Sequence, residues 1–282
     1  MKNCMIYYFS GTGNTEYACK TLSAEMVKLG WSVNMQKIEN IENDISIDYD
    51  LLAIAYPVHG FNAPTIIDEF CVNLPEGNGK KFFVVKTSGE PLKLNDASSM
   101  FFMKTLLEKN YSFIGEYHYV MPYNIIFRHS DDMVSLMIRT LREKVVDDAL
   151  EIDSCQVTKP NYRLIPKITS AIVRIEHPAM KLIGKGFKID KNKCVNCNKC
   201  MNNCPTKNIA KDKDGYIFGN ECLGCMRCAF NCPKNAINIG ILNGWKVNGK
   251  YDFENISVSE NPKIIKYCHS SYKNYFFDTQ ND

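Results

Sequence analysis

Residues 194–233 read CVNCNKCMNNCPTKNIAKDKDGYIFGNECLGCMRCAFNCP, in which one spacing of cysteines occurs twice. The first run is Cys194-x2-Cys197-x2-Cys200-x3-Cys204-Pro205, and the second is Cys222-x2-Cys225-x2-Cys228-x3-Cys232-Pro233. Eight of the chain's 13 cysteines therefore lie within this stretch. Three cysteines that are each separated by two residues, with a fourth cysteine followed by proline, form the spacing that holds cubane iron–sulfur clusters. The repeat predicts two such clusters.

The two runs resemble those of bacterial two-cluster ferredoxins, in which the fourth cysteine of each run ligates the other cluster. The resemblance implies a small α+β domain that holds two [4Fe-4S] clusters through crossed ligation. One cluster would be held by Cys194, Cys197, Cys200 and Cys232, and its partner by Cys222, Cys225, Cys228 and Cys204.

Three other interpretations of these cysteines compete with this one. Zinc could use pairs of Cys-x2-Cys, but a third cysteine in phase and the lack of histidine in the stretch fit zinc poorly. A disulfide framework is typical of small secreted domains, whereas this chain has 282 residues. Clusters with a purely structural role stay open, although two adjacent cubanes favour electron transfer.

Length and composition predict a cytoplasmic protein of two domains. No apolar run approaches the roughly 20 residues that a membrane span needs. The N-terminal sequence MKNCMIYYFSGTG has too short an apolar run for a signal peptide. In the cytoplasm, the cysteines outside the two runs are expected to be reduced thiols. These are Cys4, Cys19, Cys71, Cys155 and Cys268.

The net charge of +3 conceals an asymmetry between the two halves of the chain. Residues 1–150 carry a balance of −5, and residues 151–282 carry +8. A basic half suggests a nucleic-acid partner, but each cluster with its four thiolates is negatively charged, and nearby lysines would offset that charge. We therefore expect no nucleic-acid partner.

The N-terminal stretch predicts a strand, a tight loop and a helix. The apolar run CMIYYF (4–9) precedes the loop SGTGNT (10–15), and EYACKTLSAEMVKLG (16–30) follows with apolar residues at helical spacing. Backbone amides and the helix dipole make such a loop an anion site.

Two common phosphate loops do not match this segment. A nucleoside-triphosphate loop would need lysine where Asn14 stands, and a dinucleotide loop would need glycine where Glu16 stands. The segment resembles instead the flavodoxin loop [Ser/Thr]-x-Thr-Gly-x-Thr, with Cys19 as a small apolar departure from the usual alanine. A turn that binds nothing is the alternative. The resemblance implies that FMN phosphate is bound by Ser10, Gly11, Thr12, Gly13, Asn14 and Thr15.

The rest of this half alternates predicted strands and helices, as a flavodoxin-like α/β fold does. LLAIAY (51–56) and KFFVVK (81–86) are apolar runs suited to strands buried on both faces. Helices are expected near 64–73, 97–110 and 128–150, with a fifth strand near 113–121. The resemblance implies a doubly wound parallel sheet of order 2-1-3-4-5, with the cofactor at the carboxyl ends of the strands.

Two further loops are predicted to clamp the flavin ring of FMN. Tyr56 and Phe61 are candidates to stack on the ring, and Gly60 could turn its peptide toward flavin N5. His59 is interpreted as an ordinary surface residue in preference to a group that tunes the flavin. The candidates are Tyr56, Pro57, Val58, His59, Gly60, Phe61, Thr87, Ser88, Gly89 and Glu90.

The expected domains are an FMN-binding domain (1–150), a helical basic linker (151–186), a two-cluster domain (187–240) and an extension packing across both (241–282). In the linker, we expect Pro166 to start a helix and Pro178 to interrupt it. Residues 159–193 contain nine basic and two acidic residues. This strip could touch a membrane surface, dock an acidic partner, or lie solvated with its apolar side packed between domains. The last is favoured.

Taken together, the chain resembles fusions of a flavodoxin with a two-cluster ferredoxin, which implies an electron path between the clusters and FMN. In one hypothesis the chain is a reductase of a small-molecule acceptor. In the other it is a carrier that serves a redox partner protein. An adaptor whose clusters sense oxygen or iron is a third class, unsupported by any output module. The sequence predicts neither a catalytic residue nor an oligomeric state.

Overall fold

The N-terminal half of the computed structural model contains a five-stranded parallel sheet of order β2-β1-β3-β4-β5. The structure describes residues 2–41, 45, 48–213, 215–255, 264 and 266–277. The strand order confirms the predicted doubly wound, flavodoxin-like fold. The strands are β1 (Lys2–Tyr8), β2 (Trp31–Lys37), β3 (Leu51–Pro57), β4 (Lys81–Ser88) and β5 (Ser112–Val120).

The central strands β3 and β4 are buried on both faces, and alternate residues enter two separate cores. Ala53 and Phe83 belong to one core, while Ile54 and Val84 belong to the other. Because successive side chains of a strand point to opposite faces, an uninterrupted apolar run is what such a strand requires.

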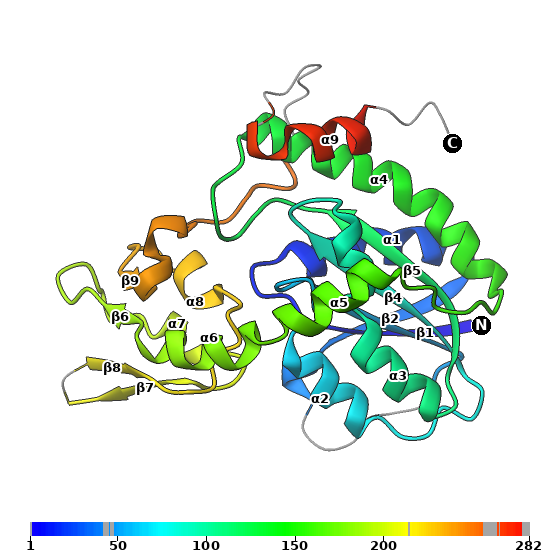
Figure 1. Ribbon diagram of the computed structural model, residues 1–282, viewed down its shortest axis with the longest axis horizontal. Coiled ribbons are helices and arrows are strands. Elements are labelled where there is room, and N and C mark those ends of the chain that lie inside the picture. The colour runs from blue at the N-terminus through cyan, green and yellow to red at the C-terminus, as the bar shows by residue number, and fades with distance from the viewer. Residues whose placement is uncertain are drawn as a thin grey trace.

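Two helices cover each face of the sheet (Figure 1). On one face lie α1 (Asn14–Lys28) and α4 (Asp131–Ser154), and on the other lie α2 (Thr65–Asn73) and α3 (Met100–Glu108). Ser130 caps α4 by accepting a hydrogen bond from the backbone amide of Met133. Short 3-10 turns, η1 (Ile38–Asn40) and η2 (Lys93–Ala97), complete this half.

The linker forms two helices end to end, α5 (Leu164–Val173) and α6 (Glu176–Lys185), between the sheet and the cluster segment (Figure 1). Pro166 lies in the first turn of α5. The predicted interruption is present: the helix breaks at Arg174 and Ile175, one turn before Pro178, which itself lies in the first turn of α6. A proline has no amide to donate and its ring crowds the carbonyl four residues earlier, here that of Arg174, so the preceding helix ends there.

The favoured interpretation of the linker's apolar side is wrong. Five aliphatic side chains that were expected to pack between domains are 50–75% exposed, and so is the neighbouring Leu164. Hydrogen bonds turn the opposite side of α5 toward the sheet: Asn62 Nδ2 donates to the Ser170 carbonyl at 2.9 Å, and Ser170 Oγ donates to Asn62 Oδ1 at 2.7 Å. The exposed side chains are Leu164, Ile165, Ile168, Ile172, Ile175 and Leu182.

The cluster segment is built from short elements around a small core. Strand β6 pairs with β9, and β7 pairs with β8, each pair antiparallel. Residue 214, which joins β7 to β8, lies outside the described residues. The elements are β6 (Lys188–Ile189), α7 (Lys199–Asn202), β7 (Ile209–Asp212), β8 (Gly215–Phe218), α8 (Arg227–Phe230), β9 (Ile237–Asn238) and the 3-10 helix η3 (Gly240–Trp245).

The C-terminal elements η4 (Lys266–Cys268) and α9 (His269–Phe276) return to the sheet. Tyr272 is fully buried against Met133 and Met137 of α4. Its hydroxyl donates to the Gly89 carbonyl and lies 2.9 Å from Nε2 of His129. Since the Tyr123 amide donates to His129 Nδ1 at 3.2 Å, a neutral His129 can donate from Nε2. Every helix in the described part of the chain is too short or too polar to cross a bilayer.

We expect acid to destabilise the protein in part through His129. Burial lowers the pKa of His129 to about 4, whereas the unfolded value is about 6.5. The contribution of neutral His129 should be complete above about pH 6.5, fall by up to about 1.4 kcal/mol per pH unit down to about pH 4, and then level off.

The unfolding free energy in urea, measured anaerobically from about pH 7 down to about pH 5, checks this expectation. His129→Gln should reduce the slope of the unfolding free energy against pH by up to about 1.4 kcal/mol per pH unit, which corresponds to the uptake of one proton on unfolding. His269→Gln, at an exposed position of α9, is the control. An unaltered slope in His129→Gln would contradict the assignment.

Candidate functional site

The loop between β1 and α1 has the geometry of an anion site. Gly13 precedes α1 with a φ of 106°, a left-handed conformation that favours glycine. Ser10 Oγ accepts hydrogen bonds from the amides of Gly13 and Glu16, both at 3.2 Å, which folds the loop over the helix end.

Donors in this loop remain available to a ligand. No described residue accepts a hydrogen bond from the amides of Asn14 and Thr15, which lie in the first turn of α1. Asn14 Oδ1 is buried without a partner, although its Nδ2 donates to the Pro122 carbonyl at 2.7 Å. Free amides at a helix start suit a phosphate, and an unpaired acceptor suits a ligand hydroxyl. The residues present therefore fit FMN.

The second predicted loop ends in a tight turn. His59 and Asn62 exchange two backbone hydrogen bonds of 2.8 Å, and Gly60 and Phe61 between them have φ values of 48° and 60°. Two positive φ values define a type I′ turn. An ideal Cβ on Gly60 would lie 1.7 Å from Glu176 Oε2, so the start of α6 covers this turn.

Two residues of this loop differ from expectation. Tyr56 is fully buried, donates or accepts a hydrogen bond with Ser98 Oγ at 2.9 Å and packs edge-on against Phe102. It is therefore a core residue with no free ring face for stacking. His59 is half-buried and is therefore not an ordinary surface residue. Burial and the nearby His177 lower the pKa of its imidazole to about 4.

The third predicted loop joins the first directly. Thr87 Oγ1 lies 2.8 Å from Thr15 Oγ1, and the Thr87 carbonyl accepts from the Val58 amide at 2.8 Å. Glu90 is buried and receives hydrogen bonds from Tyr123 and Ser271, at 2.8 and 2.6 Å. The loops at 10–15, 57–62 and 87–90 thus meet at one end of the sheet.

A fourth loop at this end, residues 121–129, was missed by the sequence analysis. Asn124 Nδ2 donates to Thr12 Oγ1 at 3.2 Å, and the ring of Tyr123 lies against Gly89, whose ideal Cβ would be 2.3 Å from it. The signal that could have found this loop is its place after the fifth strand, because the carboxyl ends of parallel strands share one edge.

The eight cysteines of the two runs surround two cavities. Each cavity takes three cysteines from one run and the fourth from the other, which is the arrangement that crossed ligation requires. One is lined by Cys194, Cys197, Cys200 and Cys232, and the other by Cys222, Cys225, Cys228 and Cys204.

The two runs repeat each other in local hydrogen bonding. Each run donates two backbone amides to its own sulfurs, one from two residues after the first cysteine and one from four residues after the last. The N···S distances are 3.4 Å (Asn196 to Cys194), 3.3 Å (Asn208 to Cys204), 3.5 Å (Gly224 to Cys222) and 3.2 Å (Ala236 to Cys232). Such bonds to sulfur help to set cluster potential.

The spacing of these thiols disfavours zinc. Among the described residues, no three side chains of His, Cys, Asp or Glu are close enough to hold a single metal ion. Zinc gathers its thiolates at about 2.3 Å from one centre, whereas a cubane spreads them over its irons. All 13 cysteines lie in the described part of the chain, and none forms a disulfide.

The second cysteine run touches the loop at 10–15. An ideal Cβ on Gly11 would lie 2.5 Å from the Cys225 carbonyl oxygen, so only glycine permits this approach. Cys225 is 8% exposed, and burial raises the pKa of its thiol to about 12.

Arg227 stabilises the contact between the second cysteine run and the loop at 10–15. Its Nη2 donates to the Ser10 carbonyl at 2.8 Å and pairs with Glu39 at 2.5 Å, while its Nε donates to the Gly11 carbonyl at 3.2 Å. The guanidinium therefore binds two carbonyls of the predicted phosphate loop from a position between Cys225 and Cys228.

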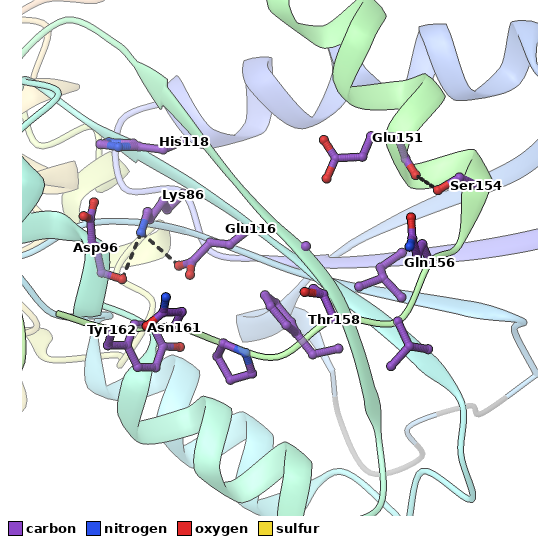
Figure 2. Close-up of a pocket in the computed structure, with 15 residues that line it drawn as sticks. Lys86, Asp96, Glu116, His118, Glu151, Ser154, Gln156, Thr158, Asn161 and Tyr162 are labelled. Atoms are coloured by element: carbon purple, nitrogen blue, oxygen red, sulfur yellow. Dashed lines mark hydrogen bonds and ion pairs between the residues drawn. The ribbon is translucent and has the colours of Figure 1, made fainter. Parts of the chain in front are cut away.

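A larger cavity, of about 540 Å³, lies at the free edge of β5 (Figure 2). Lys86 closes one end, where its Nζ lies 2.9 Å from Glu116 Oε1 and donates to the Asn95 carbonyl at 3.0 Å. His118 Nε2 lies 2.7 Å from Ser88 Oγ. Because the Lys86 ammonium is already paired, this cavity offers that charge to no anion.

Comparison with known proteins supports the assignment of the cluster segment as a cluster-binding domain. Residues 193–237 match the family model of the 4Fe-4S dicluster domain, which confirms the prediction of two [4Fe-4S] clusters. A search of the curated proteins found no match.

Three solved structures are similar to the N-terminal half. A flavodoxin of Streptococcus pneumoniae TIGR4 is 18% identical, with 54% of this chain and 98% of the flavodoxin covered and a TM-score of 0.41. Flavodoxin 2 of Bacillus cereus is 16% identical, with 54% of this chain and 98% of the flavodoxin covered and a TM-score of 0.42. An NADH:FMN oxidoreductase in its apo form is 13% identical, with 59% of this chain and 96% of the oxidoreductase covered and a TM-score of 0.39. The fold assignment rests on the strand order itself.

Gly11→Ala should separate the phosphate loop from the second cysteine run, because its methyl group would overlap the Cys225 carbonyl. Overpacking typically costs about 1–3 kcal/mol, so amide hydrogen exchange in residues 222–230 should rise by roughly tenfold. Gly244→Ala is the matched control, since nothing lies within 4 Å of its ideal Cβ. Equal exchange in both variants would count against the contact.

Crossed ligation predicts which cysteine substitutions act together. Cys204→Ala and Cys225→Ala should remove the same cluster, while Cys232→Ala and Cys197→Ala remove the other, each leaving about half of the iron. EPR spectra of the remaining cluster should agree within each pair, with Cys155→Ala as a control outside the runs. If Cys204→Ala instead matched Cys197→Ala, each run would hold its own cluster.

Proposed function

We propose that the chain is an iron–sulfur flavoprotein that moves electrons between two [4Fe-4S] clusters and FMN, and that it reduces a small-molecule acceptor at the flavin. The observation that carries this proposal is the contact between Cys225 and Gly11. It brings a predicted cluster ligand against the loop whose amides fit the FMN phosphate.

Burial suggests an order for the electron path. Cys197 in the first cavity is exposed, whereas Cys225 in the second is 8% exposed and lies against Gly11. A cluster near the surface can accept electrons from a donor, and the second cluster would pass them toward the flavin. The side chains thus favour a path that runs from solvent inward.

The protein's own residues would hold and shield the cofactors. FMN exchanges one or two electrons and a cubane exchanges one, so the bound groups would supply the conversion between one-electron and two-electron transfer. Arg227 fixes the distance between the cluster run and the phosphate loop. Tyr123 and Glu90 hold the loop at 87–90 closed over the end of the sheet.

The carrier hypothesis has one observation in its favour. A cavity of about 300 Å³ beside the loop at 10–13 is lined by Lys199 and Lys250, together with two cations that are already paired, Lys37 with Glu16 at 3.2 Å and Arg227 with Glu39 at 2.5 Å. Lys199 is next to Cys200, so an acidic redox protein docked here would approach both cysteine runs. In that case the acceptor would be the partner's cofactor.

An anaerobic reductive titration tests the proposal. The reconstituted protein should contain about eight irons and about one FMN, and electrons added to the clusters should appear in the flavin spectrum. Arg227→Gln should slow this transfer by roughly tenfold, because the lost charge-assisted bonds are worth about 1.5–3 kcal/mol.

The control for this variant is Arg139→Gln, on the exposed side of α4. If both kinds of centre are present and reduction of one never alters the spectrum of the other, the proposal is wrong. Reduction of small acceptors by the protein alone would favour the reductase, and transfer only to an acidic partner protein would favour the carrier.

A further inference from the structure

The linker exposes a continuous stripe of aliphatic side chains to solvent. Leu164, Ile165, Ile168 and Ile172 are each at least 50% exposed. At about 100° of rotation per residue, these four positions fall within an arc of about 100° on α5. Ile175 continues the stripe at the junction with α6, where it is 73% exposed.

The opposite side of α5 is fixed to the sheet domain. Ser170 is fully buried in its reciprocal hydrogen bonds with Asn62. Arg174 pairs with Asp68 at 2.6 Å, and its guanidinium lies 3.9 Å from the ring centre of Phe101. These contacts hold the helix in one orientation, so the stripe faces outward as a consequence of the fold.

Exposed cations flank the stripe. Arg163 and Lys167 are exposed on one side of it, and Lys185 is exposed at the end of α6. The only carboxylate between residues 159 and 189 is Glu176, which is half-buried beside Gly60. A helix face that combines aliphatic side chains with basic neighbours is typical of helices that lie in a membrane interface.

We propose that the exposed face of α5 and the start of α6 binds the surface of a membrane that contains anionic phospholipids. The aliphatic side chains would enter the boundary between headgroups and acyl chains, and Arg163 and Lys167 would lie among the phosphates. The attachment is peripheral and does not depend on the redox function proposed above.

Vesicle flotation with the full-length, anaerobically reconstituted protein tests this proposal. The protein should float with vesicles of phosphatidylglycerol and phosphatidylcholine, but not with vesicles of phosphatidylcholine alone. Raising the ionic strength should weaken the binding, because salt screens the charges at the surface.

Two sets of variants separate the apolar from the ionic contribution. Ile168→Ser with Ile172→Ser should weaken binding by roughly a hundredfold, because each buried isoleucine contributes about tenfold. Val72→Ser, at an equally exposed apolar position of α2, is the control. Arg163→Gln with Lys167→Gln should weaken binding by about fivefold for each cation, with Lys104→Gln on α3 as the control.

Each alternative result overturns the proposal. Equal binding to neutral and anionic vesicles would remove the role of the cations. If the protein binds no vesicles, and Ile168→Ser with Ile172→Ser converts a dimer to a monomer in light scattering, the stripe is an interface between copies of this chain. If it binds no vesicles and is monomeric, the stripe has no membrane role. Circular dichroism and iron content confirm that the variants remain folded.

Discussion

The close approach of two backbones, at Gly11 and Cys225, is the constraint on which the arrangement of the two domains depends. No side chain longer than a hydrogen atom fits at position 11 while the Cys225 carbonyl stays where it is. Arg227 then occupies the remaining space and satisfies two carbonyls of the phosphate loop. Because a buried carbonyl needs a donor, the cluster segment completes the hydrogen bonding of the sheet domain.

The sequence was most informative where function depends on local spacing. The positions of the eight cysteines follow from cluster chemistry, and the apolar runs at 51–56 and 81–86 are sufficient to identify central strands of a parallel sheet. The loop at 121–124 could have been placed at the same edge from its position after the fifth strand. Its individual contacts with Thr12 and Gly89 could not have been predicted, because they join segments far apart in the chain.

Orientation was harder to predict than location. Tyr56 continues the alternation of Leu52 and Ile54, so its ring belongs to their core and not to the cofactor end. In α5, amphipathicity identifies an apolar face but does not say whether that face points inward. The answer depends on Asn62 and Ser170, two small polar residues 108 positions apart whose hydrogen bonds turn the isoleucines outward.

The place of Arg227 has a consequence for engineering. This arginine stands inside the second cysteine run, immediately before Cys228, and Lys199 holds the equivalent position before Cys200 in the first. One residue that joins the halves is thus embedded in the metal-binding motif, in addition to the residues of the linker that contact the sheet. A ferredoxin fragment transplanted onto this sheet would dock in the same way only if it brought an arginine at that position, so the domain is not an interchangeable part.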